Sequence, residues 1–234
     1  MGNGICNAGR VDFAQLLVQV IPLGIGAAFT PGLFAMQVLV VSGDPWRRRA
    51  LAVAVGSAAA FILVGALFLL GFTQLDEVTT VIEDDFGAWL RIVSGASLWV
   101  GAVYLFRPHP ALRQRAEHDI SGYVGRASSW VFLGIAFALS IKDVSSFIVL
   151  APALHDIAVA PVNVVEQAVL LLVLYALALS PVLVPPALRL VFGHRMDPVF
   201  AMLYRFTMDH QFQLVGSMAA VIGAYLLISG MLRL

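Results

Sequence analysis

The chain has 234 residues, of which 60% are hydrophobic and 12% charged, and its formal net charge is zero. Soluble domains carry about 25% charged residues, so this composition excludes an ordinary soluble domain and predicts an integral membrane protein. Nucleic acid is not an expected partner, because no basic cluster is interleaved with aromatic residues. The single cysteine, Cys6, excludes an intrachain disulfide, and the five histidines are scattered, so we expect neither a metal site nor a cofactor.

Six stretches of the chain are apolar and long enough to cross a bilayer, which takes about 20 residues. They are Phe13–Val41, Ala50–Leu75, Phe86–Phe106, Trp130–Leu154, Val162–Val184 and Phe212–Leu232. The sequence therefore predicts an all-α integral membrane protein with six transmembrane helices.

A polar linker at 107–126 divides these helices into a first group of three at 1–106 and a second group of three at 127–234. We expect the linker to be cytoplasmic. Because three is an odd number, the second group is inverted in the membrane relative to the first, which is the plan of many secondary transporters. The sequence thus predicts two inverted three-helix repeats.

The opening helix of each repeat contains an interruption. In the first helix it consists of Thr30, Pro31 and Gly32, where proline removes a backbone donor and glycine relaxes the steric limits on turning. In the fourth helix it consists of Ser140, Ile141, Lys142 and Asp143, followed by Ser145 and Ser146. Matching breaks indicate a substrate site near the midplane, where unwound backbone binds ligand. We expect the two breaks to meet around one polar cavity, although the first taken alone fits an ordinary kink.

Lys142 is the only lysine of the chain, and it lies in the middle of an apolar stretch. A charge at the centre of a membrane span costs from about 3 to more than 10 kcal/mol, so it normally faces a protein interior or a water-filled cavity. We expect Lys142 to bind an anionic group, and Asp143 either to balance its charge or to exchange a proton with it. In the alternative, the helix ends at Ile141 and the pair lies in a loop, but Trp130–Ile141 is too short to cross a bilayer core.

Four further residues are candidates for the transport path. Gln37 either faces the same cavity as Lys142 or forms a hydrogen bond with a neighbouring helix. Glu166 is either a proton site or a carboxylate that stabilises a helix N-terminus. His155 and Asp156 follow the fourth stretch on the outer side and are candidates for a substrate exit.

Arg91, near the start of the third stretch, is close enough to an end to reach the interface.

The arginines predict the orientation of the chain. Ten of the fourteen basic residues fall in alternate connections, and these are Arg47, Arg48, Arg49, Arg107, Arg113, Arg115, Arg126, Arg189, Arg195 and Arg205. The positive-inside rule places these connections in the cytoplasm. Both termini are then expected outside the cytoplasm, in a multi-pass protein of the cytoplasmic membrane.

At its two breaks the chain resembles the LysE superfamily of exporters, whose members carry a proline-glycine turn in the first helix and an Asn-Pro-Lys-like turn in the fourth. The matching residues here are Thr30-Pro31-Gly32 and Ser140-Ile141-Lys142-Asp143. The basic loop at 44–49 and the Gly223 to Gly230 ending are most similar to the glycolipid-addressing branch, also called the sulfolipid-addressing (GAP or Sap) branch. Because Ser140 and Ile141 replace asparagine and proline, the sequence leaves open whether the fourth helix is truly broken.

The resemblance implies export of a cell-envelope glycolipid. We expect a secondary transporter or flippase, in contact with membrane lipids, whose substrate is an anionic lipid or lipid-linked precursor. Two alternatives stay open, namely an exporter of an amino acid or small cation and a non-transporting scaffold that assists a lipid exporter. A dimer or a partner exporter is compatible with each alternative. An enzyme is not expected, because no catalytic arrangement lies at the required depth.

Overall fold

The computed structural model describes residues 13–28, 30–76, 83–106 and 128–233, with the side chains of 72–76 and 83–85 left out. The described secondary structure is entirely helical. The elements are α1 (Phe13–Ala27), α2 (Pro31–Ser42), α3 (Trp46–Asp76), α4 (Glu83–Leu105), α6 (Ser129–Lys142), α7 (Val144–Val159), α8 (Val164–Ala178), α9 (Ser180–Phe192), the short 3-10 helix η1 (Gly193–Met196) and α10 (Asp197–Met231). The all-α prediction is therefore confirmed.

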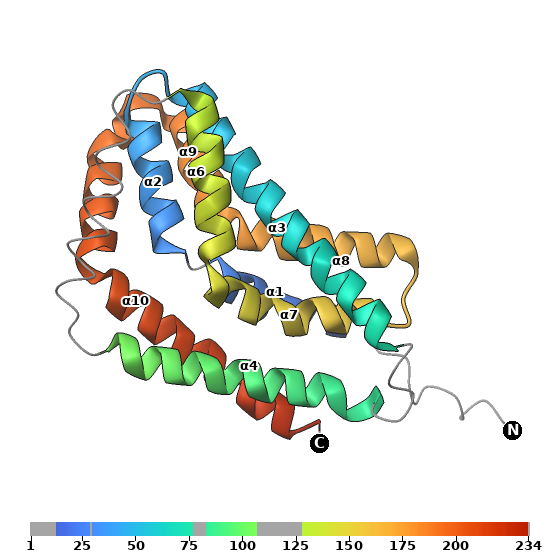
Figure 1. Ribbon diagram of the computed structural model, residues 1–234. Helices are drawn as coiled ribbons and strands as arrows, with labels where there is room; N and C mark the ends of the chain where they lie inside the picture. The colour runs from blue at the N-terminus through green and yellow to red at the C-terminus, as the bar shows by residue number, and fades with distance from the viewer. Residues whose placement is uncertain (1–12, 29, 77–82, 107–127, 234) are drawn as a thin grey trace, which may run out of the picture.

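The described helices form two arms that meet at an angle (Figure 1). One arm contains α2, α6 and α9, together with the first part of α10. The other contains α1, α7, α8 and α4, together with the last part of α10. The long helix α3 runs through both arms, and so does α10. The breaks of the predicted first and fourth helices lie where the two arms join.

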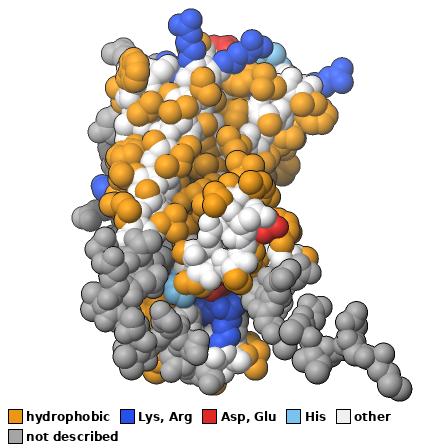
Figure 2. All heavy atoms as spheres, turned by 90° about the vertical axis from the view of Figure 1, so that its right-hand side faces the viewer, with side chains coloured by type: hydrophobic (Ala, Val, Ile, Leu, Met, Phe, Trp, Pro, Cys, Tyr) orange, Lys and Arg blue, Asp and Glu red, His pale blue; other side chains and the backbone are white. Residues whose placement is uncertain are grey.

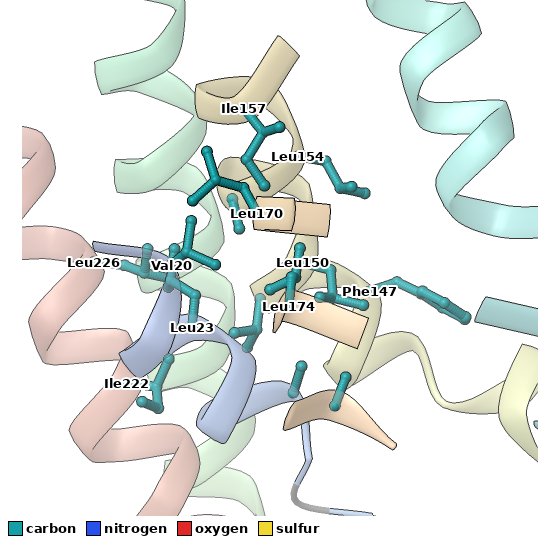
Figure 3. Close-up of a cluster of buried hydrophobic side chains, with 14 of the residues drawn as sticks. Val20, Leu23, Phe147, Leu150, Leu154, Ile157, Leu170, Leu174, Ile222 and Leu226 are labelled. Carbon is teal, nitrogen blue, oxygen red and sulfur yellow. The ribbon is translucent and has the colours of Figure 1, made fainter. Parts of the chain in front are cut away.

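Each arm has its own hydrophobic core. In the first arm, Leu33, Val53, Phe132, Val182 and Phe200 are among the buried residues of one cluster. In the second arm, another cluster draws on α1, α7, α8 and the end of α10 (Figure 3), and its labelled members include Leu23, Leu150, Leu174 and Leu226. Because each broken stretch has one half in each arm, it contributes residues to both hydrophobic cores.

Both predicted interruptions are present in the structure. The axes of α1 and α2 are bent by 69°, and those of α6 and α7 by 67°. In the first case Pro31 occupies the first turn of α2, where its missing N–H leaves no hydrogen bond unmade. In the second case α6 ends at Lys142, and Asp143 serves as the N-cap of α7. The fourth helix is thus broken without a proline, because an aspartate N-cap starts a new helix.

The structure supports the prediction of a membrane protein, but its described residues contain fewer candidate spans than the six predicted. Three stretches, Trp46–Gly71, Phe86–Leu105 and Ser180–Met231, are long and apolar enough to cross a bilayer, and each bent pair adds one more, which gives up to five. The predicted fifth span is divided at Leu179 between α8 and α9. The sixth begins at Asp197 rather than Phe212, since α10 is one helix of 35 residues. The count of six therefore stays a prediction.

The surface has an apolar band and a basic end. Figure 2 shows hydrophobic side chains over much of the upper part of one face, several Lys and Arg side chains at the top, and others at the left edge and in the lower centre. The upper end holds the start of α3 and η1, where Arg47, Arg48 and Arg195 are exposed. Large hydrophobic residues with exposed side chains, such as Val100 and Leu172, occur on several helices. This distribution is the one expected of a protein whose sides face lipid and whose end faces water.

Candidate functional site

The two helix breaks meet through a direct hydrogen bond. Thr30, between α1 and α2, donates from Oγ1 to Oδ2 of Asp143, between α6 and α7, at 2.6 Å. Thr30 Oγ1 also lies 3.3 Å from the hydroxyl oxygen of Ser146. We call the residues Thr30, Asp143, Ser145 and Ser146 the junction. The sequence prediction that both breaks come together is confirmed.

Asp143 is the centre of the junction. Its Oδ1 accepts a hydrogen bond from Ser145 Oγ at 2.6 Å, and its Oδ2 accepts one from Ser146 Oγ at 2.6 Å in addition to that from Thr30. The carboxylate also accepts weakly from the Ser146 backbone N–H, at 3.4 Å. Three hydroxyls and one amide therefore surround a single carboxylate, so both of its oxygens have hydrogen-bond donors within the junction.

The junction ties helix ends as well as side chains. Ser146 Oγ is also 2.8 Å from the carbonyl oxygen of Ala27, at the end of α1. Asp143 lies at the N-terminus of α7, where the helix dipole favours a negative charge, and Lys142 lies in the last turn of α6, where the dipole favours a positive one. Each charge is thus stabilised by the helix that carries it.

Lys142 differs from its expected arrangement. Its side chain is exposed, and among the described residues it forms no ion pair with Asp143 or with any other carboxylate. Asp143 does not pair directly with Lys142, because the Asp143 oxygens accept hydrogen bonds from the hydroxyls of Thr30, Ser145 and Ser146. Lys142 directly precedes Asp143 in the chain, and its exposed side chain is accessible to a ligand or to lipid.

The other predicted junction residues have mainly backbone roles. Pro31 and Gly32 form the first turn of α2, and a side chain added at Gly32 would meet open space within 4 Å. Ser140 is fully buried, and its carbonyl oxygen accepts a hydrogen bond of 3.2 Å from the Asp143 N–H. The Thr30 hydroxyl does not cap α2, because it bonds to Asp143 instead.

A cavity of about 390 Å³ adjoins the junction between α2, α9 and α10. Thr30 and Pro31 belong to its wall. The other lining residues are Ala28, Phe34, Ser180, Pro181, Val184, Leu203, Phe206, Thr207 and Leu214. We call this space the α10 cavity. The sequence led us to expect a polar cavity, but this one is mainly apolar, since the polar groups of the junction bond to one another.

Gln37 and Glu166 are not part of the junction. Gln37 is fully buried, and its amide nitrogen donates to the backbone oxygens of Val182 at 2.8 Å and Ala50 at 3.3 Å. It therefore links α2 to α9 and α3, which is the second of its two predicted roles. Glu166 forms a capping box with Asn163 at the start of α8, with reciprocal hydrogen bonds of 2.8 and 3.1 Å. This geometry matches its helix-stabilising alternative.

His155 and Asp156 lie inside α7, rather than after the fourth span, and both are buried. Asp156 forms an ion pair with Arg91 of α4, which is only 1% exposed, and a second one with Arg233 at 3.1 Å. Arg91 also donates to Ser229 Oγ at 2.9 Å. The expectation that Arg91 reaches an interface is therefore wrong. A buried arginine with a paired aspartate on another helix gives no signal in a single sequence beyond its charge inside an apolar stretch.

A comparison with protein families identifies one match across most of the chain. The family model described as Sap, sulfolipid-1-addressing protein, matches residues 20–232, a range that contains every helix break and the junction. Neither the curated proteins nor the solved structures include a match.

Proposed function

The chain belongs to the family described as Sap, sulfolipid-1-addressing protein, and from this membership we propose that it is a secondary transporter that moves an envelope lipid, or a lipid-linked precursor, outward across the cytoplasmic membrane. The family supports a role in lipid export or addressing. That this chain carries the lipid itself, rather than assisting another exporter, is the proposal.

The observation that carries the proposal is the hydrogen bond between Thr30 and Asp143. It joins two helix breaks inside an apolar helical protein, and such breaks are where transporters bind substrate. An ionisable residue in a membrane span is costly, and such residues normally mark a substrate or ion pathway. Contact with a substrate would explain why a charged residue, Asp143, stands inside this apolar span.

The pairing of the helices supports two inverted repeats. The first half of each broken helix packs against the second half of the other, since α1 contacts α7 and α2 contacts α6. The second predicted span, α3, packs against α6 and α7, and the fifth, α8 with α9, packs in the same way against α1 and α2. The third and sixth, α4 and α10, pack against each other. This reciprocity is what a two-fold axis in the membrane plane would produce.

The junction and the adjacent residue Lys142 together offer complementary chemistry for a head group. The exposed ammonium of Lys142 suits a sulfate, phosphate or carboxylate. The carboxylate of Asp143 has only acceptors, so it suits the hydroxyl donors of a sugar. The hydroxyls of Thr30, Ser145 and Ser146 can rotate from Asp143 to oxygens of the ligand. A glycolipid with an anionic group would satisfy all of these residues.

The energy for export would come from an ion gradient or from a partner protein, because the sequence contains no GxxxxGK[ST] phosphate-binding loop.

In the proposed orientation, which rests on the positions of the arginines, both ends of the chain lie outside the cytoplasm. Arg233, just after α10, donates to Gln19 in the first half of α1 at 2.7 Å, so the end of α10 lies beside the first half of α1. The exposed arginines of α3 and η1 lie at another end (Figure 1). In a Cys6→Ser background, Pro161→Cys should react with an impermeant maleimide applied to intact cells, and Arg195→Cys should not. The reverse pattern would overturn the orientation.

The function is tested with a deletion strain that carries either the wild-type chain or Asp143→Asn. Lipids are extracted separately from the cell surface and from the cytoplasmic membrane. Deletion should move one envelope lipid from the surface to the cytoplasmic membrane, and only the wild-type chain should restore it. The purified chain should then move the same lipid in proteoliposomes.

Other outcomes select the alternatives. A scaffold would restore surface lipid in cells but give no flux in proteoliposomes that lack its partner. An exporter of an amino acid or small cation would leave the lipid distribution unchanged and change the concentration of that solute in the cell.

A further inference from the structure

We infer that the α10 cavity binds an acyl chain of the transported lipid while its head group occupies the junction. This inference rests on the proposed function and adds to it the place and the residues that hold the tail. The contact between tail and protein would make the cavity a determinant of which lipids are carried.

The lining of the cavity has the chemistry of a hydrocarbon site. Phe34, Val184, Leu203, Phe206 and Leu214 supply apolar side chains from three helices. No charged residue lines the cavity among the residues that the structure describes. A volume of about 390 Å³ lies within the range of roughly 300–1,000 Å³ typical of ligand pockets, most of which are lined by hydrophobic and aromatic side chains.

The cavity and the junction share a wall. Thr30 lines the cavity, and its hydroxyl is at the same time bonded to Asp143. If the polar head of a ligand bound at Asp143 and its apolar tail lay in the cavity, Thr30 would contact the ligand where the head joins the tail. A small cation or a polar amino acid would have no group to place in the apolar space.

The cavity also borders the lipid-facing surface. Val184 of α9 and Phe206 of α10 line it and are 47% and 51% exposed. Exposed apolar side chains at the rim of a cavity cost no free energy when they contact lipid tails, whereas contact with the water of an aqueous pore would be unfavourable. This placement favours an occupant that enters sideways from the bilayer, which a membrane lipid does.

Photo-crosslinking locates the tail directly. The probe is a phosphatidylglycerol with a diazirine near the end of one acyl chain, added to the wild-type chain in lipid nanodiscs. After irradiation, mass spectrometry should find the label on Phe34, Leu203, Phe206 or Leu214 in excess over exposed residues of other faces, such as Val100 and Leu172. Equal labelling of all exposed faces would overturn the inference, since it would indicate bulk lipid only.

A pair of neighbouring substitutions on α10 tests the same point by function. Leu203→Trp fills the cavity, whereas Met202→Trp changes a residue that is 65% exposed and does not line it. Leu203→Trp should lower both cavity labelling and lipid flux by about tenfold or more, the factor that about 1.4 kcal/mol of lost binding gives. Met202→Trp should leave both near the wild-type values.

The outcomes separate this inference from the proposed function. If the wild-type chain moves no lipid, the proposed function fails. If it moves lipid, and Leu203→Trp moves it equally well with labelling outside the cavity, only the inference fails. Should Leu203→Trp not fold, the labelling pattern of the wild-type chain still decides.

Discussion

Thr30 and Asp143 are 113 positions apart in the chain and are joined by a hydrogen bond of 2.6 Å. The bond links the break between α1 and α2 to the break between α6 and α7. It therefore fixes the two breaks relative to each other at the place where the two arms join. A hydrogen bond to a charged group contributes about 1.5–3 kcal/mol. This contact is therefore a sensitive test of whether the breaks act as one unit.

Thr30→Val removes the hydroxyl and keeps the shape of the side chain. We expect it to lower lipid export several-fold and to lower the thermal stability of the detergent-solubilised protein, because Asp143 loses a donor at a partly buried position. Thr30→Ser retains the hydroxyl and should stay close to wild type in both measurements. Equal export by the valine and serine variants would show that the bond is dispensable.

Lys142→Gln should reduce flux strongly while leaving the amount of inserted protein unchanged. The lysine makes no ion pair with a described residue, so its removal leaves no carboxylate without a partner. Lys142→Arg keeps the charge but replaces a compact ammonium by a planar fork, and partial activity is expected. Flux is measured in proteoliposomes and normalised to protein, with Arg195→Gln as the control for loss of an exposed charge. Wild-type flux from Lys142→Gln would remove the lysine from the substrate site.

The buried network around Asp156 predicts an asymmetric response to substitution. Asp156→Leu leaves Arg91, which is 1% exposed, without its carboxylate, whereas Arg91→Met leaves Asp156 paired with Arg233. Breaking a buried pair typically costs about 3–5 kcal/mol. Asp156→Leu should therefore destabilise the protein more than Arg91→Met does, and the double variant should recover part of the loss. Thermal unfolding in detergent measures all three, and equal effects of the single changes would contradict the geometry.

Two glycines of α4 predict opposite effects of the same substitution. A Cβ at Gly95 would lie 2.7 Å from the carbonyl oxygen of Gly223 on α10, a backbone atom that cannot move cheaply. Gly95→Ala should cost about 1–3 kcal/mol, as overpacking does. At Gly101 nothing lies within 4 Å, so Gly101→Ala should stabilise the helix by about 0.5–1 kcal/mol. Unfolding temperatures in detergent compare the two, and similar shifts would show that α4 and α10 are less closely packed than described.

The sequence by itself determined the class of the protein, its helical nature and the places where its first and fourth helices break. These features are local. The apolar stretches indicate a membrane protein. Pro31 next to Gly32 favours an interruption of the helix, and a polar pair such as Lys142 and Asp143 is costly inside an apolar helix. The match between the two breaks along the chain was enough to predict that they meet.

Only the tertiary structure decided which side chains bond to which. Asp143 bonds to Thr30 rather than to Lys142, Arg91 is buried against Asp156, and Gln37 links helices instead of lining the cavity. A helix that is hydrophobic all round carries no pattern that tells which face turns inward. Helices in a bilayer also lack a hydrophobic force that would orient them, so shape and a few polar contacts set their rotation. Those contacts join residues far apart in the chain and emerge only when the helices are packed.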